Sequence, residues 1–65
     1  MLSMRDVKLG DRLRADSGFT CIEGGTVLEV AQDDEGELYV PCSHGKHYIK
    51  GQVDVHGRVV GFAIV

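Results

Sequence analysis

Two cysteines and two histidines are the residues of this chain that could do chemistry together. Cys42, His44 and His47 form a C-x-H-x-x-H pattern, and Cys21 lies 21 positions before Cys42. Two thiolates and two imidazoles can hold zinc in a tetrahedral Cys₂His₂ site, and a structural metal would compensate for the thin core of a small domain. The spacing is not that of a C-x₂₋₄-C knuckle, so a zinc site requires Cys21 to arrive from another strand.

The same residues allow other interpretations. A Cys21–Cys42 disulfide requires Cα atoms about 4.4–6.8 Å apart, which adjacent strands can provide, whereas a cytosolic location favours free thiols. Nucleophilic catalysis would pair Cys42 with His44 or His47 and use Asp54 to orient the base, but the sequence offers no oxyanion pocket. The simplest interpretation has buried apolar cysteines and exposed histidines. We therefore expect no enzyme and no cofactor, with zinc as the alternative.

An acidic segment and two tyrosines indicate a partner-binding surface. The segment 33–37 (DDEGE) lacks the twelve-residue spacing of a calcium loop, so it predicts a solvated hairpin tip that could contact a basic partner. Tyr39 and Tyr48, with Pro41, would form an aromatic patch for peptides if exposed; their alternative role is ordinary packing. The candidate contact residues are Tyr39, Tyr48, Asp33, Asp34 and Glu35.

The charge distribution argues against nucleic acid as the main partner. The 65 residues carry a net charge of −3, and residues 15–40 hold seven carboxylates with no lysine or arginine. Binding to a phosphate backbone depends on clustered cations that displace counterions, and the middle of this chain would repel one. Nucleic-acid binding remains the alternative function, and it would use Arg5, Lys8, Arg12, Arg14, Lys46, Lys50 and Arg58.

The elements that position these residues are short strands joined by turns. The chain has nine glycines, and no segment longer than about eight residues shows helical periodicity. The clearest hairpin has strands at 26–31 and 37–42 around a polar loop, with Leu38, Val40 and Cys42 on the inner face. Pro41 cannot donate to a ladder, so the second strand should be an edge strand or be bulged near its end.

Shorter segments complete the predicted sheet. Residues 12–15 predict a strand with Leu13 inward, and a turn should follow at 16–18. Residues 47–49 predict another strand, and 52–55 a strand or a turn of 3₁₀ helix. Residues 58–65 predict a closing strand with Val60, Phe62 and Ile64 inward, and Gly61 indicates a bend or a close backbone approach.

The stretch from Val7 to Val30 resembles the opening of SH3-like barrels of the KOW type. Gly10-Asp11 matches the first turn, Gly18-Phe19 the second, and Gly25-Thr26-Val27 the start of the second strand. The resemblance implies an SH3-like barrel and, through the basic loops of such elements, contacts with nucleic acid or ribosomes. The KOW element usually has glycine where Cys21 or Ile22 stands in this chain, and this chain lacks cations between residues 15 and 40.

These observations predict one all-β domain over residues 1–65, a small five-stranded SH3-like barrel with at most one short 3₁₀ turn. Residues 1–9 should be either a flexible start or a first strand. The sequence shows no secretory segment and no run of about 20 apolar residues, which predicts a cytoplasmic protein without a membrane partner. The expected function is a non-enzymatic interaction module that binds a protein partner or self-associates; a nucleic-acid-binding accessory domain and a zinc-stabilised module are the alternatives.

Overall fold

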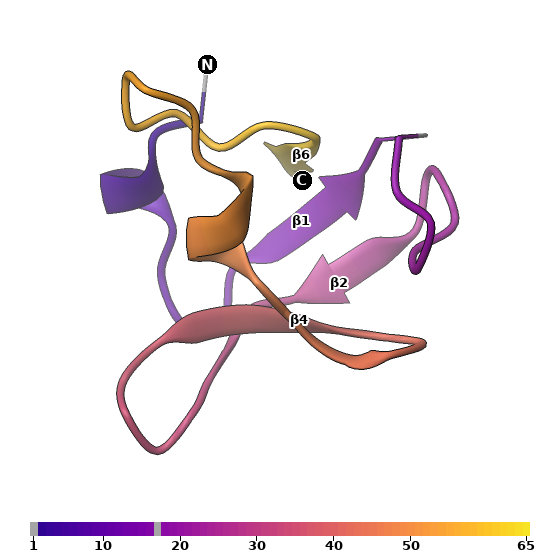
Figure 1. Ribbon diagram of the computed structural model, residues 1–65, viewed down its shortest axis with the longest axis horizontal. Coiled ribbons are helices and arrows are strands. Elements are labelled where there is room, and N and C mark those ends of the chain that lie inside the picture. Colours follow the sequence, from indigo (N-terminus) through magenta and orange to yellow (C-terminus); the bar gives the residue numbers. More distant parts are fainter. Residues whose placement is uncertain (1, 17) are drawn as a thin grey trace.

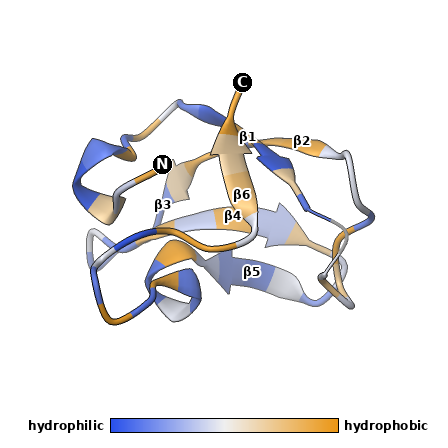
Figure 2. Cartoon of the chain, turned by 90° about the horizontal axis from the view of Figure 1, so that it is seen from above, coloured by the Kyte–Doolittle hydropathy of each residue, from blue (hydrophilic) through white to orange (hydrophobic). Residues whose placement is uncertain are grey.

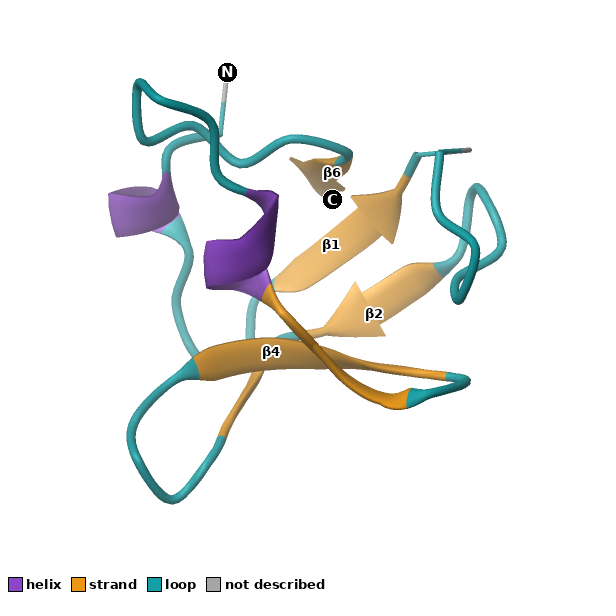
Figure 3. Ribbon diagram, viewed as in Figure 1, coloured by secondary structure: helices purple, strands orange, loops and turns teal. Residues whose placement is uncertain are grey.

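A computed structural model describes residues 2–16 and 18–65. Met1 and Ser17 lie outside the described residues, so the turn expected at 16–18 is described only in part. The elements, shown in Figures 1 and 3, are the 3₁₀ turns η1 (Met4–Asp6) and η2 (Ile49–Gln52) and the strands β1 (Arg12–Ala15), β2 (Val27–Glu29), β3 (Ala31–Gln32), β4 (Leu38–Cys42), β5 (Gly45–Tyr48) and β6 (Phe62–Ile64).

The all-β class is confirmed, and the predicted number of strands is wrong. The described residues form six strands in two antiparallel three-stranded sheets, in the orders β2-β1-β6 and β3-β4-β5. The strands do not close into a complete barrel in the part of the chain that the structure describes. There are also two 3₁₀ turns there where at most one was expected.

The extra strand arises because the segment 26–31 changes sheet at Val30. The Val30 N–H donates to the Asp11 carbonyl at 2.8 Å, and its carbonyl accepts from the Gly10 N–H at 2.9 Å. The next residue, Ala31, already pairs with Tyr39 of β4. The Val30 side chain is only 1% exposed, so a core residue anchors the point where the chain passes between the sheets.

The predicted hairpin is confirmed, including its inner face. Ala31 pairs with Tyr39 and Gln32 with Leu38. Val40 is fully buried, and Leu38 and Cys42 pack against the core. The alternation of β4 was therefore predicted correctly from the sequence.

The prediction for Pro41 needs correction, because β4 is the central strand of its sheet. The Asp33 N–H donates to the Glu37 carbonyl at 3.0 Å, so the backbone groups of Glu37, Tyr39 and Pro41 point toward β3. The pairing of β3 with β4 ends at Tyr39. Pro41 is tolerated because the strand has no ladder bond to make on that side.

The closing strand is shorter than predicted, and only Phe62 of its three expected core residues is buried. Phe62 is 7% exposed, whereas Val60 and Ile64 are 52% and 50% exposed. Val60 precedes a bend at Gly61, where φ is +87°, and the bend breaks the alternation; Ile64 lies on an edge strand. Figure 2 shows β6 in hydrophobic orange and β5 largely in hydrophilic blue. The close approach predicted at Gly61 is confirmed, since a Cβ atom there would lie 2.7 Å from the Phe19 ring.

The N-terminal segment forms η1 and an isolated bridge between Ser3 and Arg58, not a strand. The Met4 N–H donates to the Gly57 carbonyl, and the Val59 N–H donates to the Leu2 carbonyl. The segment 52–55 was expected to be a strand or a 3₁₀ turn; the structure has the 3₁₀ turn η2 slightly earlier, and Val53 forms an isolated bridge with Val59. The described part of the segment 1–9 is thus bonded to the chain before β6.

The core is drawn from strands and loops alike. Its buried residues are Val7, Leu13, Ala15, Ile22, Val30, Val40, Ile49, Val59 and Phe62. Leu13 is fully buried between exposed Arg12 and Arg14, as the alternation predicted. Among the described residues, none of the helical segments has the length and apolar character needed to cross a bilayer.

Candidate functional site

Three of the four residues predicted as metal ligands lie together. Cys21 comes from the loop between β1 and β2, Cys42 ends β4, and His47 lies in β5. Their candidate ligand atoms all lie within 4.8 Å of one another, and Cys21 Sγ is 3.2 Å from His47 Nδ1. All three residues are half-buried. The Cys₂His cluster, as we call Cys21, Cys42 and His47, therefore joins a loop to the β4–β5 hairpin.

His44 stands apart from this cluster. It is exposed in the turn between β4 and β5, and it is not among the metal-capable residues that the structure brings together in the described chain. The pairing explains the difference between the two histidines, because His47 lies opposite buried Val40 and so faces inward with Cys42. Of the four residues predicted as ligands, the structure thus brings three together and leaves His44 apart.

The loop that carries Cys21 is held in place on both sides of the cluster. The Ser43 N–H and the Ser43 hydroxyl donate to the Cys21 carbonyl at 3.3 and 3.0 Å. The Phe19 ring meets the His47 ring edge-on, with centroids 5.0 Å apart, and stacks on Phe62 at 4.8 Å. These contacts fix both the backbone at Cys21 and the plane of the imidazole.

Both cysteines are free thiols. Burial raises the pKa of the Cys21 thiol, and the neighbouring Cys42 raises it further. A raised pKa keeps the thiol protonated at neutral pH, the opposite of what activates a nucleophile. Asp54, considered above as an orienting group, instead accepts from the backbone N–H groups of His56 and Arg58 at 2.8 and 3.0 Å.

The outer face of the β4–β5 hairpin carries the two tyrosines. Tyr39 and Tyr48 lie directly opposite each other, with ring centroids 5.8 Å apart, and both are half-buried. Lys46 Nζ lies 5.2 Å from the centre of the Tyr39 ring, and Lys50 Nζ lies 5.7 Å from that of Tyr48. We call these four residues the tyrosine–lysine face.

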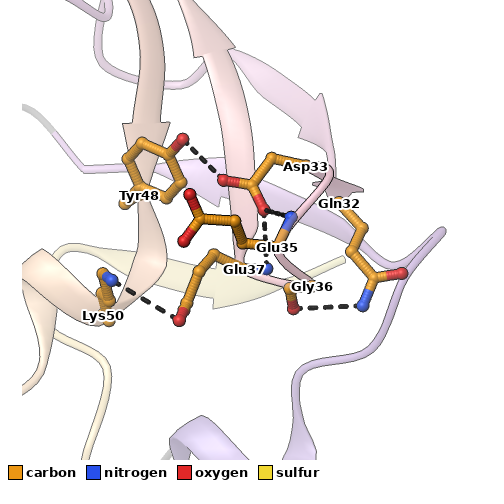
Figure 4. Close-up of polar contacts among 7 residues, drawn as sticks. All are labelled: Gln32, Asp33, Glu35, Gly36, Glu37, Tyr48 and Lys50. Carbon is orange, nitrogen blue, oxygen red and sulfur yellow. Dashed lines mark hydrogen bonds and ion pairs between the residues drawn. The ribbon is translucent and has the colours of Figure 1, made fainter.

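Asp33 organises the acidic loop next to this face (Figure 4). Its Oδ1 accepts from the N–H groups of Glu35 and Glu37 at 2.9 Å each, and its Oδ2 accepts from the Tyr48 hydroxyl at 2.8 Å. The Glu37 N–H, followed by the Tyr48 hydroxyl, lowers the pKa of Asp33, and the same bond to Asp33 raises the pKa of Tyr48. The predicted contact residue Asp33 thus bonds within the chain.

The other acidic residues of the loop differ in their surroundings. Asp34 and Glu35 are exposed at its tip, as a solvated hairpin requires. Glu37 forms an ion pair with Lys50, at 3.5 Å (Figure 4). The loop and the tyrosine–lysine face together carry four carboxylates and two ammonium groups, so these residues have an excess of two negative charges.

The seven cations proposed for nucleic-acid binding lie on several elements. Arg12 and Arg14 are exposed on β1 of one sheet, whereas Lys46 and Lys50 lie on β5 and η2 beside the other. Arg58 forms an ion pair with Asp54 at 3.7 Å. The remaining two, Arg5 and Lys8, belong to the N-terminal segment.

Two contacts of these sites were not predicted from the sequence. Asp33 begins a turn in which an aspartate accepts from N–H groups two and four residues later, a pattern typical of Asx turns that could have been recognised. The packing of Phe19 on His47 joins residues 28 positions apart and has no local signal. Comparison of the chain with protein-family models, curated proteins and solved structures finds no match.

Proposed function

We propose that this chain is a non-enzymatic interaction module that binds an extended segment of a protein partner at the tyrosine–lysine face. The observation that carries the proposal is the opposed pair of Tyr39 and Tyr48, half-exposed on a strand pair and each covered by a lysine. Tyrosines are enriched where proteins bind one another, because the ring supplies contact area and the hydroxyl supplies a hydrogen bond at a small cost in side-chain entropy.

The edge strand β5, which lies beside this face, favours a partner segment in an extended conformation. In the order β3-β4-β5, strand β5 has a neighbour on one side, and the described residues supply no strand on the other. An extended segment can add to such an edge through main-chain hydrogen bonds while side-chain contacts provide specificity. We expect the segment to place an apolar side chain against Tyr39.

The negative charge beside the tyrosine–lysine face indicates that the partner segment carries a cationic residue. Asp34 and Glu35 are exposed at the tip of the neighbouring loop, and the loop and the tyrosine–lysine face together are negative. A lysine or arginine in the partner would meet these carboxylates and speed the encounter between the two proteins. The proposed ligand is therefore an extended segment with an apolar residue and a cationic residue.

We further propose that the two sheets form an open SH3-like barrel. Only Val30 separates β2 from β3, so the two can be regarded as one bent strand shared by both sheets. The last strand, β6, returns to pair with β1 after the 3₁₀ turn η2. With β2 and β3 combined, the sequence resemblance over residues 7–30 and the strand order support the same architecture.

The test compares capture of partners by the wild type, Tyr39→Ala and Val55→Ala from extracts of the native cell, followed by binding measurements with each purified partner. Val55 is 95% exposed and serves as the matched control. We expect a partner to be retained by the wild type and by Val55→Ala, and its dissociation constant to rise about 30-fold with Tyr39→Ala, as for an interface hot spot. Equal affinity of the two variants would contradict the proposal.

A second copy of the chain is the alternative partner, since an open strand edge can also pair with itself. Sedimentation of the purified protein distinguishes the two. A concentration-dependent dimer that Tyr39→Ala dissociates would identify the partner as another copy, whereas a monomer at all concentrations would leave a different protein as the partner.

A further inference from the structure

We propose that Cys21, Cys42 and His47 bind one zinc ion, with the fourth coordination position occupied by water or by a donor from outside the chain. The three residues come from a loop and two strands that are separated in sequence, yet their ligand atoms converge within 4.8 Å. The interaction proposed above uses the outer face of the β4–β5 hairpin, whereas Cys42 and His47 face inward. The two proposals are therefore independent.

The distances between the ligand atoms suit a tetrahedral ion. With Zn–S of about 2.3 Å and Zn–N of about 2.0–2.1 Å, tetrahedral angles place two sulfurs about 3.8 Å apart and a sulfur and a nitrogen about 3.6 Å apart. The structure has 3.2 Å between Cys21 Sγ and His47 Nδ1, and no separation in the cluster exceeds 4.8 Å. Shifts of about 1 Å, within reach of side-chain rotation, would give the ligand geometry.

The ligand atoms of the cluster, two sulfurs and one imidazole nitrogen, favour zinc because they are soft donors and because two thiolates match its charge. Sulfur and imidazole nitrogen are poor ligands for magnesium and calcium, which prefer oxygen. When zinc binds, each thiol releases its proton to water, so two thiolates and a neutral imidazole balance the two positive charges of the ion. A neutral site is the kind that a half-buried position tolerates.

Contacts around the cluster hold it ready for the ion. Ser43 donates twice to the Cys21 carbonyl, which fixes the loop over the hairpin turn. Phe19 and Phe62 lie against the His47 ring, with centroids 5.0 and 5.9 Å from it. Such outer contacts orient metal ligands and reduce the entropy lost on binding.

Outside the cluster, His44 provides an internal control. It lies three residues from His47 and two from Cys42, so a zinc site read from sequence spacing alone would include it. It is exposed in the turn and does not belong to the cluster. The three-ligand site predicts that loss of the His44 imidazole leaves zinc binding unchanged, whereas the Cys₂His₂ pattern predicts that it weakens zinc binding.

The experiment measures zinc affinity of the full chain, reduced and metal-free, by competition with a chromophoric chelator. Cobalt is then used as a spectroscopic probe, because thiolate ligands give a sulfur-to-cobalt charge-transfer band. We expect one zinc per chain and a thiolate–cobalt band. Cys21→Ser, Cys42→Ser and His47→Gln should each weaken zinc binding by more than about 100-fold, since loss of an outer contact alone costs 10–100-fold. His44→Gln should bind zinc like the wild type.

Several outcomes would overturn the proposal. Zinc binding by Cys21→Ser or His47→Gln with wild-type affinity would do so, as would an equal loss in His44→Gln. Circular dichroism of each metal-free variant shows whether it folds; if a variant does not, the wild-type cobalt spectrum decides, and absence of the thiolate band contradicts the site. A Cys21–Cys42 disulfide that persists under reductant, detected by thiol counting, would also exclude it.

Discussion

At single positions, the fold depends on contacts that a change of one or two atoms would disturb. Gly61 lies beneath the Phe19 ring in a left-handed conformation, with φ at +87°. Asp33 collects three hydrogen bonds, two from the backbone and one from Tyr48. The first contact supports the loop that carries Cys21, and the second holds the acidic loop against the tyrosine–lysine face.

Gly61→Ala should lower the free energy of unfolding by about 1–2 kcal/mol for the left-handed backbone and by a further 1–3 kcal/mol for displacing the Phe19 ring. Gly25→Ala is the control, because φ there is +89° and nothing lies within 4 Å of its added Cβ. Urea denaturation of both variants measures the two costs. Equal destabilisation would mean that the ring moves aside without cost.

Tyr48→Phe should raise the pKa of Asp33 toward its ordinary value of 3.8, since it removes one of the donors that lower it. The pKa should stay below 3.8 because the Glu37 and Glu35 N–H groups remain. A lowered pKa stabilises the fold above 3.8, and that stability is lost as the pH falls through the folded-state value. The variant should therefore lose less stability on acidification than the wild type.

NMR titration of the side-chain carboxyl groups checks this prediction. Asp54 is the internal control, because backbone N–H groups of Arg58 and His56 lower its pKa and Tyr48 is not among its partners. The pKa of Asp54 should be the same in both proteins. An unchanged pKa of Asp33 would show that the hydroxyl contributes nothing.

Among the elements, the junction between β2 and β3 decides how the two sheets meet. Val30 bonds through its backbone to the turn before β1, and its side chain is 1% exposed. Strand β2 belongs to the sheet of β1 and β6, and β3 to that of β4 and β5. A single buried residue thus connects the sheet that carries Arg12 and Arg14 to the sheet that carries Cys42 and His47.

Val30→Ala should lower the free energy of unfolding by about 2–3 kcal/mol, from the lost apolar burial and the cavity left behind. A chain of this size has a total stability of about 3–10 kcal/mol, so the loss is readily measured. Val27→Ala is the control on the same stretch; Val27 is 48% exposed, and its change should stay within about 0.5 kcal/mol. Similar effects at both positions would contradict an anchoring role for Val30.

Local patterns predicted the elements better than their assembly. The alternation of Leu38, Val40 and Cys42 follows from strand geometry, which is a property of neighbouring residues. The change of sheet at Val30 depends on hydrogen bonds to Gly10 and Asp11, about 20 positions earlier, and no local pattern encodes it. The sequence pattern grouped Cys21 and Cys42 with both His44 and His47, and only the pairing register of β4 and β5 separates His44 from the other three.

For the molecule as a whole, the distribution of charge limits the partners. The exposed Arg12 and Arg14 belong to one sheet, and Lys46 and Lys50 to the side of the other, where carboxylates outnumber them. Cations that lie on different sheets, with carboxylates near two of them, displace few counterions from a nucleic acid at one time. This distribution is consistent with the protein partner proposed above, which carries its own positive charge.

The wild type should pass through a heparin column at low salt without retention. Asp34→Lys combined with Glu35→Lys is the positive control, because it would convert the exposed tip beside Lys46 and Lys50 into a basic loop. The variant should be retained and should elute as the salt is raised. Retention of the wild type at low salt would contradict this expectation and favour the nucleic-acid alternative.

Pro41 limits the addition of foreign strands to β4, which is the step by which sheets grow into fibrils. Beyond Tyr39, the described residues place no strand beside β4 on the side of β3, and Pro41 has no N–H group to offer a foreign strand there. Cross-β growth needs an unbroken row of donors and acceptors, and the proline interrupts that row at this position of β4. A residue with an N–H group in place of Pro41 would give this side of β4 a donor through which foreign strands could join the sheet.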